Sequence, residues 1–236
     1  MSISPMGLGE LKDSHLEGVL VRAMGADGCR ALFSDARPVS FAARQTIFVE
    51  GEPGTSLIFI ESGRVEISNT SLVGRKSVLA YMGAGEVLGE IATLDGGARS
   101  ADAVASNAVT GLSLSRENVL GYISARPDIA QAVIVELCRK VRNASEMFAT
   151  QSIFDGEPRL ARGLLQLFDK WGAEHADGTT VLEERFSQQD IGEFSGLARE
   201  NVNRQIKTWT EKGVLRSDGR QLVLLDRETL EDLAER

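Results

Sequence analysis

The chain has 236 residues, of which 42% are hydrophobic and 25% charged, and its formal net charge is −8. This composition is ordinary for a globular protein, and the length favours two domains. No apolar run approaches the roughly 20 residues of a membrane-spanning helix, and residues 1–15 lack the features of a signal peptide. We therefore expect a cytoplasmic protein that does not insert into membranes.

The first 40 residues are expected to form a loose start and short helices, because apolar residues recur there at helical spacing. From Arg44 onward, short β-branched and aromatic segments alternate with glycine and polar residues. The segments expected to be strands are residues 45–50, 57–60, 65–68, 77–81, 86–88, 101–105 and 109–114. Many short strands at near-even spacing favour an antiparallel barrel or roll over a parallel sheet.

The segment GEIATLDGGARSA, at residues 89–101, combines groups that suit a phosphorylated sugar. Arg99 offers a planar fork of donors for a phosphate, and backbone N–H groups beside Ser100 and Ala101 can add to it. Glu90 can accept a hydrogen bond from a sugar hydroxyl. The segment therefore predicts a cyclic-nucleotide site, and an exposed turn with an ordinary arginine is the alternative.

A long helix is expected from about residue 128 to 153, because this stretch contains no glycine or proline. Its apolar and small residues advance by threes and fours, as in the seam of a coiled coil. These residues are Ala130, Val133, Leu137, Val141, Ala144 and Phe148. The seam predicts pairing with a second copy of the chain, and packing on its own barrel is the alternative. Residues 155–158 then break the helix and mark a hinge.

The C-terminal part of the chain predicts a helix-turn-helix. A helix is expected at residues 159–171, followed by a short helix that begins at Ser187 or Gln188 and a second helix over residues 199–210. Gly196 lies between the two short helices and suits the tight turn of this motif. The apolar segments that follow predict a wing-like hairpin.

The second of these helices carries side chains that can read base edges. Arginine can donate two hydrogen bonds to guanine, and glutamate can accept one from cytosine, each contact giving about 1–3 kcal/mol of base discrimination. Although the whole chain is acidic, the stretch from Arg199 to Arg216 holds five basic residues against two acidic ones. The residues expected to contact double-stranded DNA are Ser187, Gln188, Arg199, Glu200, Asn203, Arg204 and Lys207. For Glu200, an ion pair with Arg204 is the alternative.

The motif RENVNR, at residues 199–204, resembles the reading triplet of the CRP/FNR family of bacterial transcription regulators. The resemblance extends from about residue 30 to the end of the sequence. It implies an α+β protein with a cyclic-nucleotide-binding antiparallel β-roll in residues 1–125. A long dimerisation helix at residues 126–154 and a winged helix-turn-helix domain at residues 155–236 would complete it.

The same resemblance implies roles for the pocket residues. Gly89 and Glu90 would line the ribose, with Glu90 on the 2′-hydroxyl, while Arg99 and Ser100 would bind the cyclic phosphate. The expected ligand-binding residues are Gly89, Glu90, Ile91, Ala92, Arg99, Ser100, Ala101, Ala144 and Ser145. Family members that sense cyclic AMP carry adjacent threonine and serine on the dimer helix, whereas this chain has Ala144 and Ser145. Phosphate and ribose recognition are therefore expected to be intact and base recognition altered.

The expected effector is cyclic AMP, with cyclic GMP next and cyclic di-GMP as an alternative. The expected homodimer, formed through residues 128–153, would bind a palindromic operator and act through RNA polymerase. Cys29 and Cys138 are too few for a four-cysteine iron–sulfur cluster, and both are expected to be buried or half-buried. No metal is expected, and no catalytic motif indicates an enzyme. The second hypothesis is a regulator with a degenerate pocket, either constitutive or redox-gated through Cys138.

Overall fold

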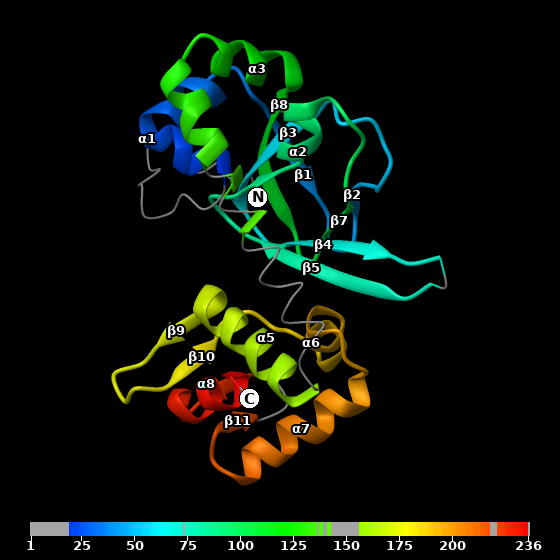
Figure 1. The fold of residues 1–236 in the computed structure, drawn as a ribbon, viewed down its shortest axis with the longest axis vertical. Helices are drawn as coiled ribbons and strands as arrows, with labels where there is room; N and C mark the ends of the chain where they lie inside the picture. The colour runs from blue at the N-terminus through cyan, green and yellow to red at the C-terminus, as the bar shows by residue number, and fades with distance from the viewer. Residues whose placement is uncertain are drawn as a thin grey trace. The chain divides into compact units, whose positions relative to one another are not determined.

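The computed structural model describes residues 19–72, 74–135, 137–138, 141–142, 156–217 and 221–235. The chain folds into two units, with the main boundary after residue 144. The N-terminal unit combines two sheets with helices, and the C-terminal unit combines helices with one small sheet (Figure 1). The expected α+β fold, with a β-roll before a helix-turn-helix, is confirmed. Within the described part of the chain, no helix is both long and apolar enough to cross a membrane.

The N-terminal unit is a roll of two four-stranded sheets. The order of the first sheet is β1 (Arg37–Phe41), β8 (Val109–Ser115), β3 (Ser56–Ser62) and β6 (Val87–Leu88). The order of the second sheet is β2 (Thr46–Phe48), β7 (Asp102–Ala105), β4 (Val65–Thr70) and β5 (Lys76–Met82). The pairs β1–β8, β3–β8, β3–β6, β2–β7 and β4–β7 all run antiparallel, as the sequence predicts.

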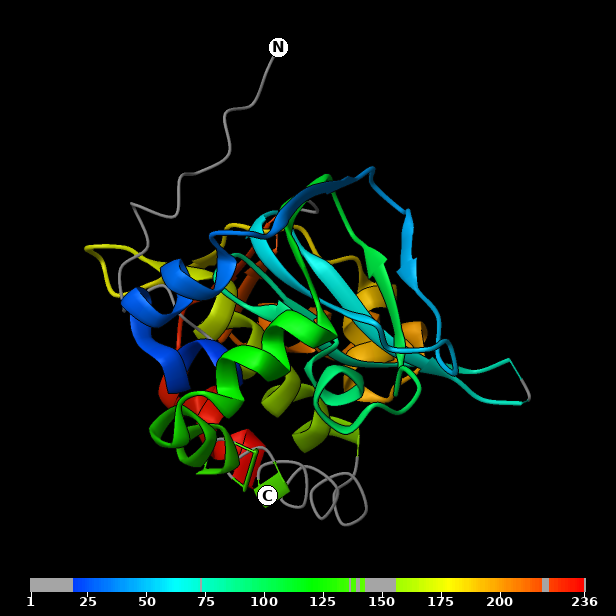
Figure 2. The same cartoon turned by 90° about the horizontal axis from the view of Figure 1, so that it is seen from above.

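Helices cover one face of the first sheet. These are α1 (Val19–Phe33), α3 (Arg116–Ser124) and the helical residues 127–135. Helix α3 begins with a side-chain cap, because the hydroxyl of its N-cap Ser115 accepts a hydrogen bond from the backbone N–H of Asn118. Figures 1 and 2 show α1 and α3 side by side against the roll.

Alternation along β3 lets one strand contribute to two cores. Ile58 and Ile60 belong to the cluster inside the roll, which joins residues of both sheets. Leu57 and Phe59 point to the opposite face and pack beneath the helices. All four side chains are buried, so β3 lies at the centre of the unit.

Two segments of the roll differ from the sequence prediction. Strand β1 lies within the first 40 residues, where helices are expected; its mostly exposed side chains and Pro38 give it no clear alternation. Residues 90–95, expected to be loop, form the short helix α2 (Glu90–Asp95). Gly89 and Gly96 bound this helix in the left-handed conformation, with φ of 80° and 77°. Six residues are too few for helical periodicity to show in a sequence.

The C-terminal unit is built on α5 (Gly156–Trp171), whose buried face includes Leu160, Leu164 and Phe168. The two helices of the helix-turn-helix, which pack on α5, are α6 (Gln188–Ser195) and α7 (Arg199–Glu211). Helix α8 (Arg227–Glu235), which is not predicted from the sequence, also packs on α5.

A small antiparallel sheet completes the C-terminal unit. Its order is β11 (Leu215–Ser217), β12 (Leu222–Leu224), β10 (Thr180–Leu182) and β9 (Gly172–Glu174). Strands β11 and β12 form the predicted wing-like hairpin, whose tip at residues 218–220 lies outside the described residues. Strands β9 and β10 are not predicted, because three residues give too little alternation to recognise.

The helix expected to form a dimer seam has two apolar sides where it is described. Val133 is 5% exposed and packs with Leu137 against the core of the roll. Ile134 and Val141 stay 61% and 65% exposed, and Cys138 is exposed as well. The expectation that both cysteines are at least half-buried is therefore wrong for Cys138.

The predicted seam thus divides between the two sides of the helix. Its member Val133 is used by the roll, whereas Ile134, Cys138 and Val141, at spacings of four and three, define an exposed apolar stripe. Of the other predicted seam residues, Ala130 is half-buried, and Ala144 and Phe148 lie outside the described residues.

Candidate functional site

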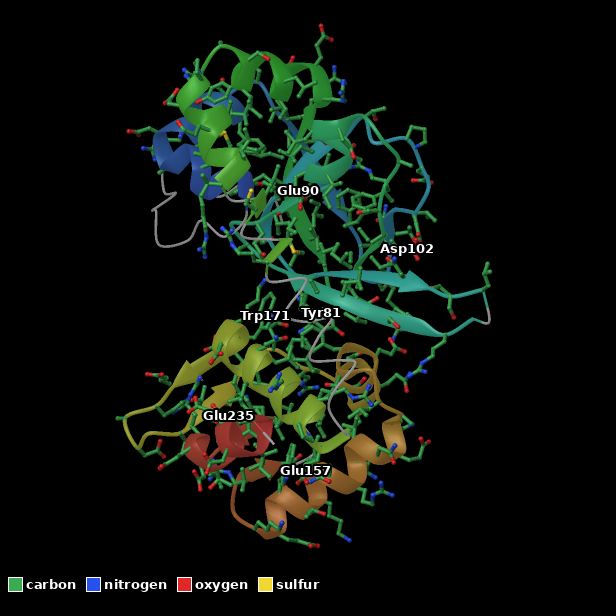
Figure 3. All side chains as sticks on the ribbon, in the orientation of Figure 1. Tyr81, Glu90, Asp102, Glu157, Trp171 and Glu235 are labelled. Atoms are coloured by element: carbon green, nitrogen blue, oxygen red, sulfur yellow. The ribbon has the colours of Figure 1, made fainter. Side chains whose placement is uncertain are left out.

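The start of α2 brings backbone and side chains of the predicted pocket together. Gly89 is the N-cap of α2, with a left-handed φ of 80° that favours glycine. A Cβ atom at this position would lie 1.9 Å from Nη1 of Arg99, so the guanidinium occupies the space that a side chain would need. Glu90 follows in the first turn and is 6% exposed (Figure 3).

Arg99 points into the protein, where it is only 6% exposed. Its Nη2 donates to the carbonyl oxygen of Ser56 at 2.8 Å, and its Nη1 donates to the carbonyl oxygen of Gly89 at 3.2 Å. The guanidinium also stacks over the ring of Phe48 at 4.3 Å from the centroid. The buried Nε has no hydrogen-bond partner among the described residues. Arg99 therefore keeps its Nε–H unsatisfied at a buried position, and each terminal nitrogen carries a second N–H that could also donate to a ligand.

Burial and two neighbouring carboxylates shift the pKa of Arg99 in opposite directions. Burial has the larger effect and lowers the pKa of Arg99, whereas the carboxylates of Glu52 and Glu90 raise it. The backbone is fixed as well, since Arg99 N–H donates to the carbonyl oxygen of Glu52 and its own carbonyl accepts from Gly51 N–H. An anion placed beside Nε would satisfy the donor and add an opposite charge.

The other predicted ligand residues differ in how far they are buried. Ala92 and Ala101 are 1% and 5% exposed beside this site, whereas Ile91 is 40% exposed and Ser100 is also exposed. Ala144 and Ser145 lie outside the described residues. Sequence reasoning missed Phe48, Glu52 and Ser56, which approach Arg99 from the preceding strands and turn. The local signal that could have found them is the turn sequence Gly-Glu-Pro-Gly at residues 51–54, which places the segments on either side of it next to each other.

The helix-turn-helix has the predicted local geometry. Ser187 caps α6 in a capping box with Asp190, so each side chain accepts from the other's backbone N–H. Gly196 ends α6 in the left-handed conformation, with φ of 69°. Val202 and Trp209 of α7 are fully buried, which leaves the opposite face of this helix to solvent.

That opposite face carries the predicted DNA-contacting residues. All five predicted residues of α7 are exposed: Arg199, Glu200, Asn203, Arg204 and Lys207. The structure shows no ion pair between Glu200 and Arg204, both of which it describes; Nη2 of Arg204 donates to Oδ1 of Asn201 at 3.0 Å. Nε2 of Gln188 donates to Oδ1 of Asn203 at 3.0 Å, and Lys207 lies 4.0 Å from Glu211.

A groove of about 560 Å³ runs between the helix-turn-helix and the wing. Its lining includes Ser187, Gln188 and Arg199 from one side, and Ser217, Gln221 and Leu222 from the other. Three of the seven predicted DNA-contacting residues therefore border a concave surface. Among the described residues, no group of three or more His, Cys, Asp or Glu side chains is placed to hold a metal ion.

Comparison with known proteins gives the same division of the chain. Residues 38–126 match the cyclic nucleotide-binding domain, and residues 158–233 match the Crp-like helix-turn-helix domain. The chain is 31% identical over 200 residues to the CRP-like cAMP-activated global transcriptional regulator of Mycobacterium tuberculosis, covering 85% of this chain and 89% of that protein. It is 31% identical over 188 residues to the cyclic AMP receptor protein of Thermus thermophilus, covering 80% and 83%.

A solved structure shows the same fold. The c-di-GMP responsive global regulator CLP of Xanthomonas campestris superimposes with a TM-score of 0.72 at 23% identity, over 85% of this chain and 99% of that one. By their names, the Mycobacterium tuberculosis relative is a transcriptional regulator and the Thermus thermophilus relative is a receptor for cyclic AMP.

Proposed function

Because the chain belongs to the CRP/FNR family of bacterial transcription regulators, we propose that it is a homodimeric, cyclic-nucleotide-controlled regulator of palindromic operators in the cytoplasm. The observation that carries the ligand half of this proposal is the buried Arg99, whose Nε lacks a partner among the described residues. We assign the roll to residues 1–125, the dimer helix to 126–154 and the DNA-binding domain to 155–236.

The cyclic phosphate would bind at Arg99, with Glu90 accepting from the ribose 2′-hydroxyl. Three features support this placement. The Nε of Arg99 is unsatisfied, the guanidinium of Arg99 fills the space that a side chain at Gly89 would need, and the carboxylate of Glu90 is buried. A phosphate that takes one or two guanidinium donors makes charge-assisted hydrogen bonds, which are stronger than neutral ones. Ser100, whose side chain is exposed, is the proposed second donor to the phosphate.

Cyclic AMP is the proposed effector, with cyclic GMP next. Both sequence relatives are named for cyclic AMP, whereas a regulator of the same fold is named for cyclic di-GMP. Ala144 lacks a hydroxyl for the base, which removes a contact of about 0.5–1.5 kcal/mol. We therefore expect weaker selection between purine bases than the family's cyclic-AMP sensors show.

Ligand control would work as a population shift. The ligand would favour one arrangement of the two dimer helices and so bring the two recognition helices, α7 of each copy, to a spacing near one DNA turn, about 34 Å. A two-fold dimer then requires a palindromic operator, and contact with RNA polymerase would follow from binding beside a promoter.

The test of this function is nucleotide titration followed by DNA binding. Isothermal titration with cyclic AMP, cyclic GMP, cyclic di-GMP and linear AMP should give heat for a cyclic nucleotide, and the same nucleotide should tighten binding to a selected palindrome. Binding of DNA with no heat from any nucleotide would favour the constitutive or redox-gated alternative. In that case oxidation of Cys138 should change the DNA affinity, and a Cys138→Ser variant should not respond.

The exposed stripe on the dimer helix supports self-association. We expect the double substitution Ile134→Glu with Val141→Glu to convert the dimer to a monomer, because each interface carboxylate would be buried without a partner. Sedimentation analysis over a range of protein concentrations measures this change. Leu225→Glu, which introduces one such carboxylate at a 36% exposed position of the C-terminal unit, is the control. An unchanged dimer in the double variant would place the interface elsewhere.

Gly89→Ala should greatly weaken nucleotide binding. The added Cβ would lie 1.9 Å from Nη1 of Arg99 and would push the guanidinium away from the site. Gly74→Ala is the matched control, because Gly74 has a similar φ of 78° but no atom within 4 Å of the place where a Cβ would lie. Both variants incur the backbone strain of about 1–2 kcal/mol, and only Gly89→Ala should lose nucleotide affinity in titration. Equal nucleotide affinities in the two variants would contradict the site.

A further inference from the structure

Glu157, in the first turn of α5, ties that helix to the recognition helix α7. Its side chain is labelled in Figure 3. Its Oε1 accepts a hydrogen bond from Nε2 of Gln205 at 2.7 Å and another from Nε1 of Trp209 at 3.2 Å. Trp209 is fully buried, and Glu157 and Gln205 are half-buried. One carboxylate oxygen therefore holds two donors that stand one helical turn apart on α7.

The hydrogen bonds to Glu157 fix the rotation of α7 about its axis, which apolar packing alone leaves adjustable. Val202, Ile206 and Trp209 bury one face of α7, but apolar contact is not directional and permits small rotations of a helix about its axis. The two hydrogen bonds to Glu157 are directional and weaken steeply away from their preferred geometry. They therefore select one rotation of α7 relative to α5.

The first half of α5 also lies against the rest of the helix-turn-helix. A Cβ at Gly156 would be 3.3 Å from Cδ2 of Leu197 in the turn, and a Cβ at Gly163, in the middle of α5, would be 2.4 Å from Oγ of Ser195 at the end of α6. The first half of α5 is therefore closely packed against the turn and the end of α6. In sequence, residue 156 directly follows the segment that leads from the dimer helix.

We propose that Glu157 is a positioning residue that sets the rotation of the recognition helix, and hence which side chains between Arg199 and Lys207 face the bases. The inference rests on the proposed function as a DNA-binding regulator. In this proposal Glu157 contacts neither the ligand nor DNA. It acts by fixing the orientation of the DNA-contacting face of α7 relative to the start of α5.

Three substitutions of Glu157 distinguish the effect of its side-chain length from the effect of its charge. Glu157→Ala removes the acceptor, Glu157→Asp keeps the charge but is one methylene too short, and Glu157→Gln keeps an oxygen at the right distance. Specific operator affinity should fall about tenfold in the Ala and Asp variants and return to within about threefold of wild type in the Gln variant. Affinity for non-specific DNA and for the nucleotide should stay unchanged in all three. Glu228→Ala, which removes an exposed carboxylate from the first turn of α8, controls for a simple helix-terminus effect.

The indole resonances give a readout that does not depend on DNA. The chain has two tryptophans, so a nitrogen–proton correlation spectrum of the full-length protein should show two indole signals. The Trp209 signal should shift in Glu157→Ala and Glu157→Asp, and the Trp171 signal, which serves as internal reference, should not. If Glu157→Ala fails to fold, Gln205→Leu removes one donor and keeps the Trp209 bond, and a smaller loss of specific operator affinity, with unchanged non-specific binding, is expected.

Three outcomes would overturn the proposal. They are an unmoved Trp209 signal in Glu157→Ala, wild-type operator affinity in that variant, or equal loss of specific and non-specific binding in the Ala, Asp and Gln variants. A wild-type protein that does not distinguish its operator from random DNA would refute the proposed function instead, while the indole signals would still report on the contact.

Discussion

Arg99→Leu should raise the dissociation constant for the cyclic nucleotide by at least about 100-fold, because a phosphate would lose two charge-assisted hydrogen bonds of about 1.5–3 kcal/mol each. The leucine also removes the cation that interacts with the carboxylates of Glu52 and Glu90, so these negative charges near the bound anion would no longer be offset by Arg99. Isothermal titration measures the effect. Ligand-dependent operator binding should disappear with it, while the weak binding seen without ligand should remain.

Two further variants make this result specific. Arg37→Leu removes an exposed arginine from β1 of the same unit and should leave nucleotide affinity unchanged. Arg99→Lys keeps the charge but not the planar fork, so its affinity should fall between those of wild type and Arg99→Leu. A melting curve of each variant checks the fold. Unchanged nucleotide affinity in a folded Arg99→Leu protein would show that the phosphate does not bind here.

The strands of the roll were predictable where turn chemistry and alternation coincide. The turn at residues 51–54 and the alternation of β4 both stand in the sequence and mark elements that the structure contains. Strand β1 was not predictable, because the side chains of an edge strand with Pro38 are mostly exposed and give no apolar alternation. Helix α2 depends on its surroundings: Thr93 Oγ1 donates to the carbonyl oxygen of Gly89, and both ends are left-handed glycines.

In the candidate site, too, the sequence predicted the residues with a local motif and missed those brought in by the fold. The sequence predicted a phosphate and sugar site at Arg99 and Glu90, because a guanidinium can donate to a phosphate and a carboxylate can accept from a sugar hydroxyl. Ser56, 43 residues away from Arg99, enters the site only through sheet register, which no local pattern encodes. The contacts behind the proposed role of Glu157 were not predictable for a similar reason, since its two donors lie 48 and 52 residues away along the chain.

If Arg199 contacts a base, Arg199→Ala should lose base discrimination, whereas Arg99→Leu loses nucleotide affinity. Arg199 is exposed in the first turn of α7, where a guanidinium that enters the major groove can donate two hydrogen bonds to one guanine. Its removal should lower discrimination by about 1–3 kcal/mol at one base pair in each half-site, with little change at the other positions. Selection of binding sites from a randomised library measures the preference position by position.

Lys207→Ala is the informative comparison, because Lys207 lies on the same face two turns further along α7 but near Glu211, 4.0 Å away. A lysine that contacts only phosphate should, when removed, weaken binding equally for all sequences and reduce the salt slope by about 1 per protomer. If Arg199→Ala behaves like Lys207→Ala, Arg199 contacts the backbone and base selection depends on Glu200 or Arg204. If only Arg199→Ala relaxes the preference, the first turn of α7 enters the groove, and the rotation of α7 becomes the variable that controls specificity.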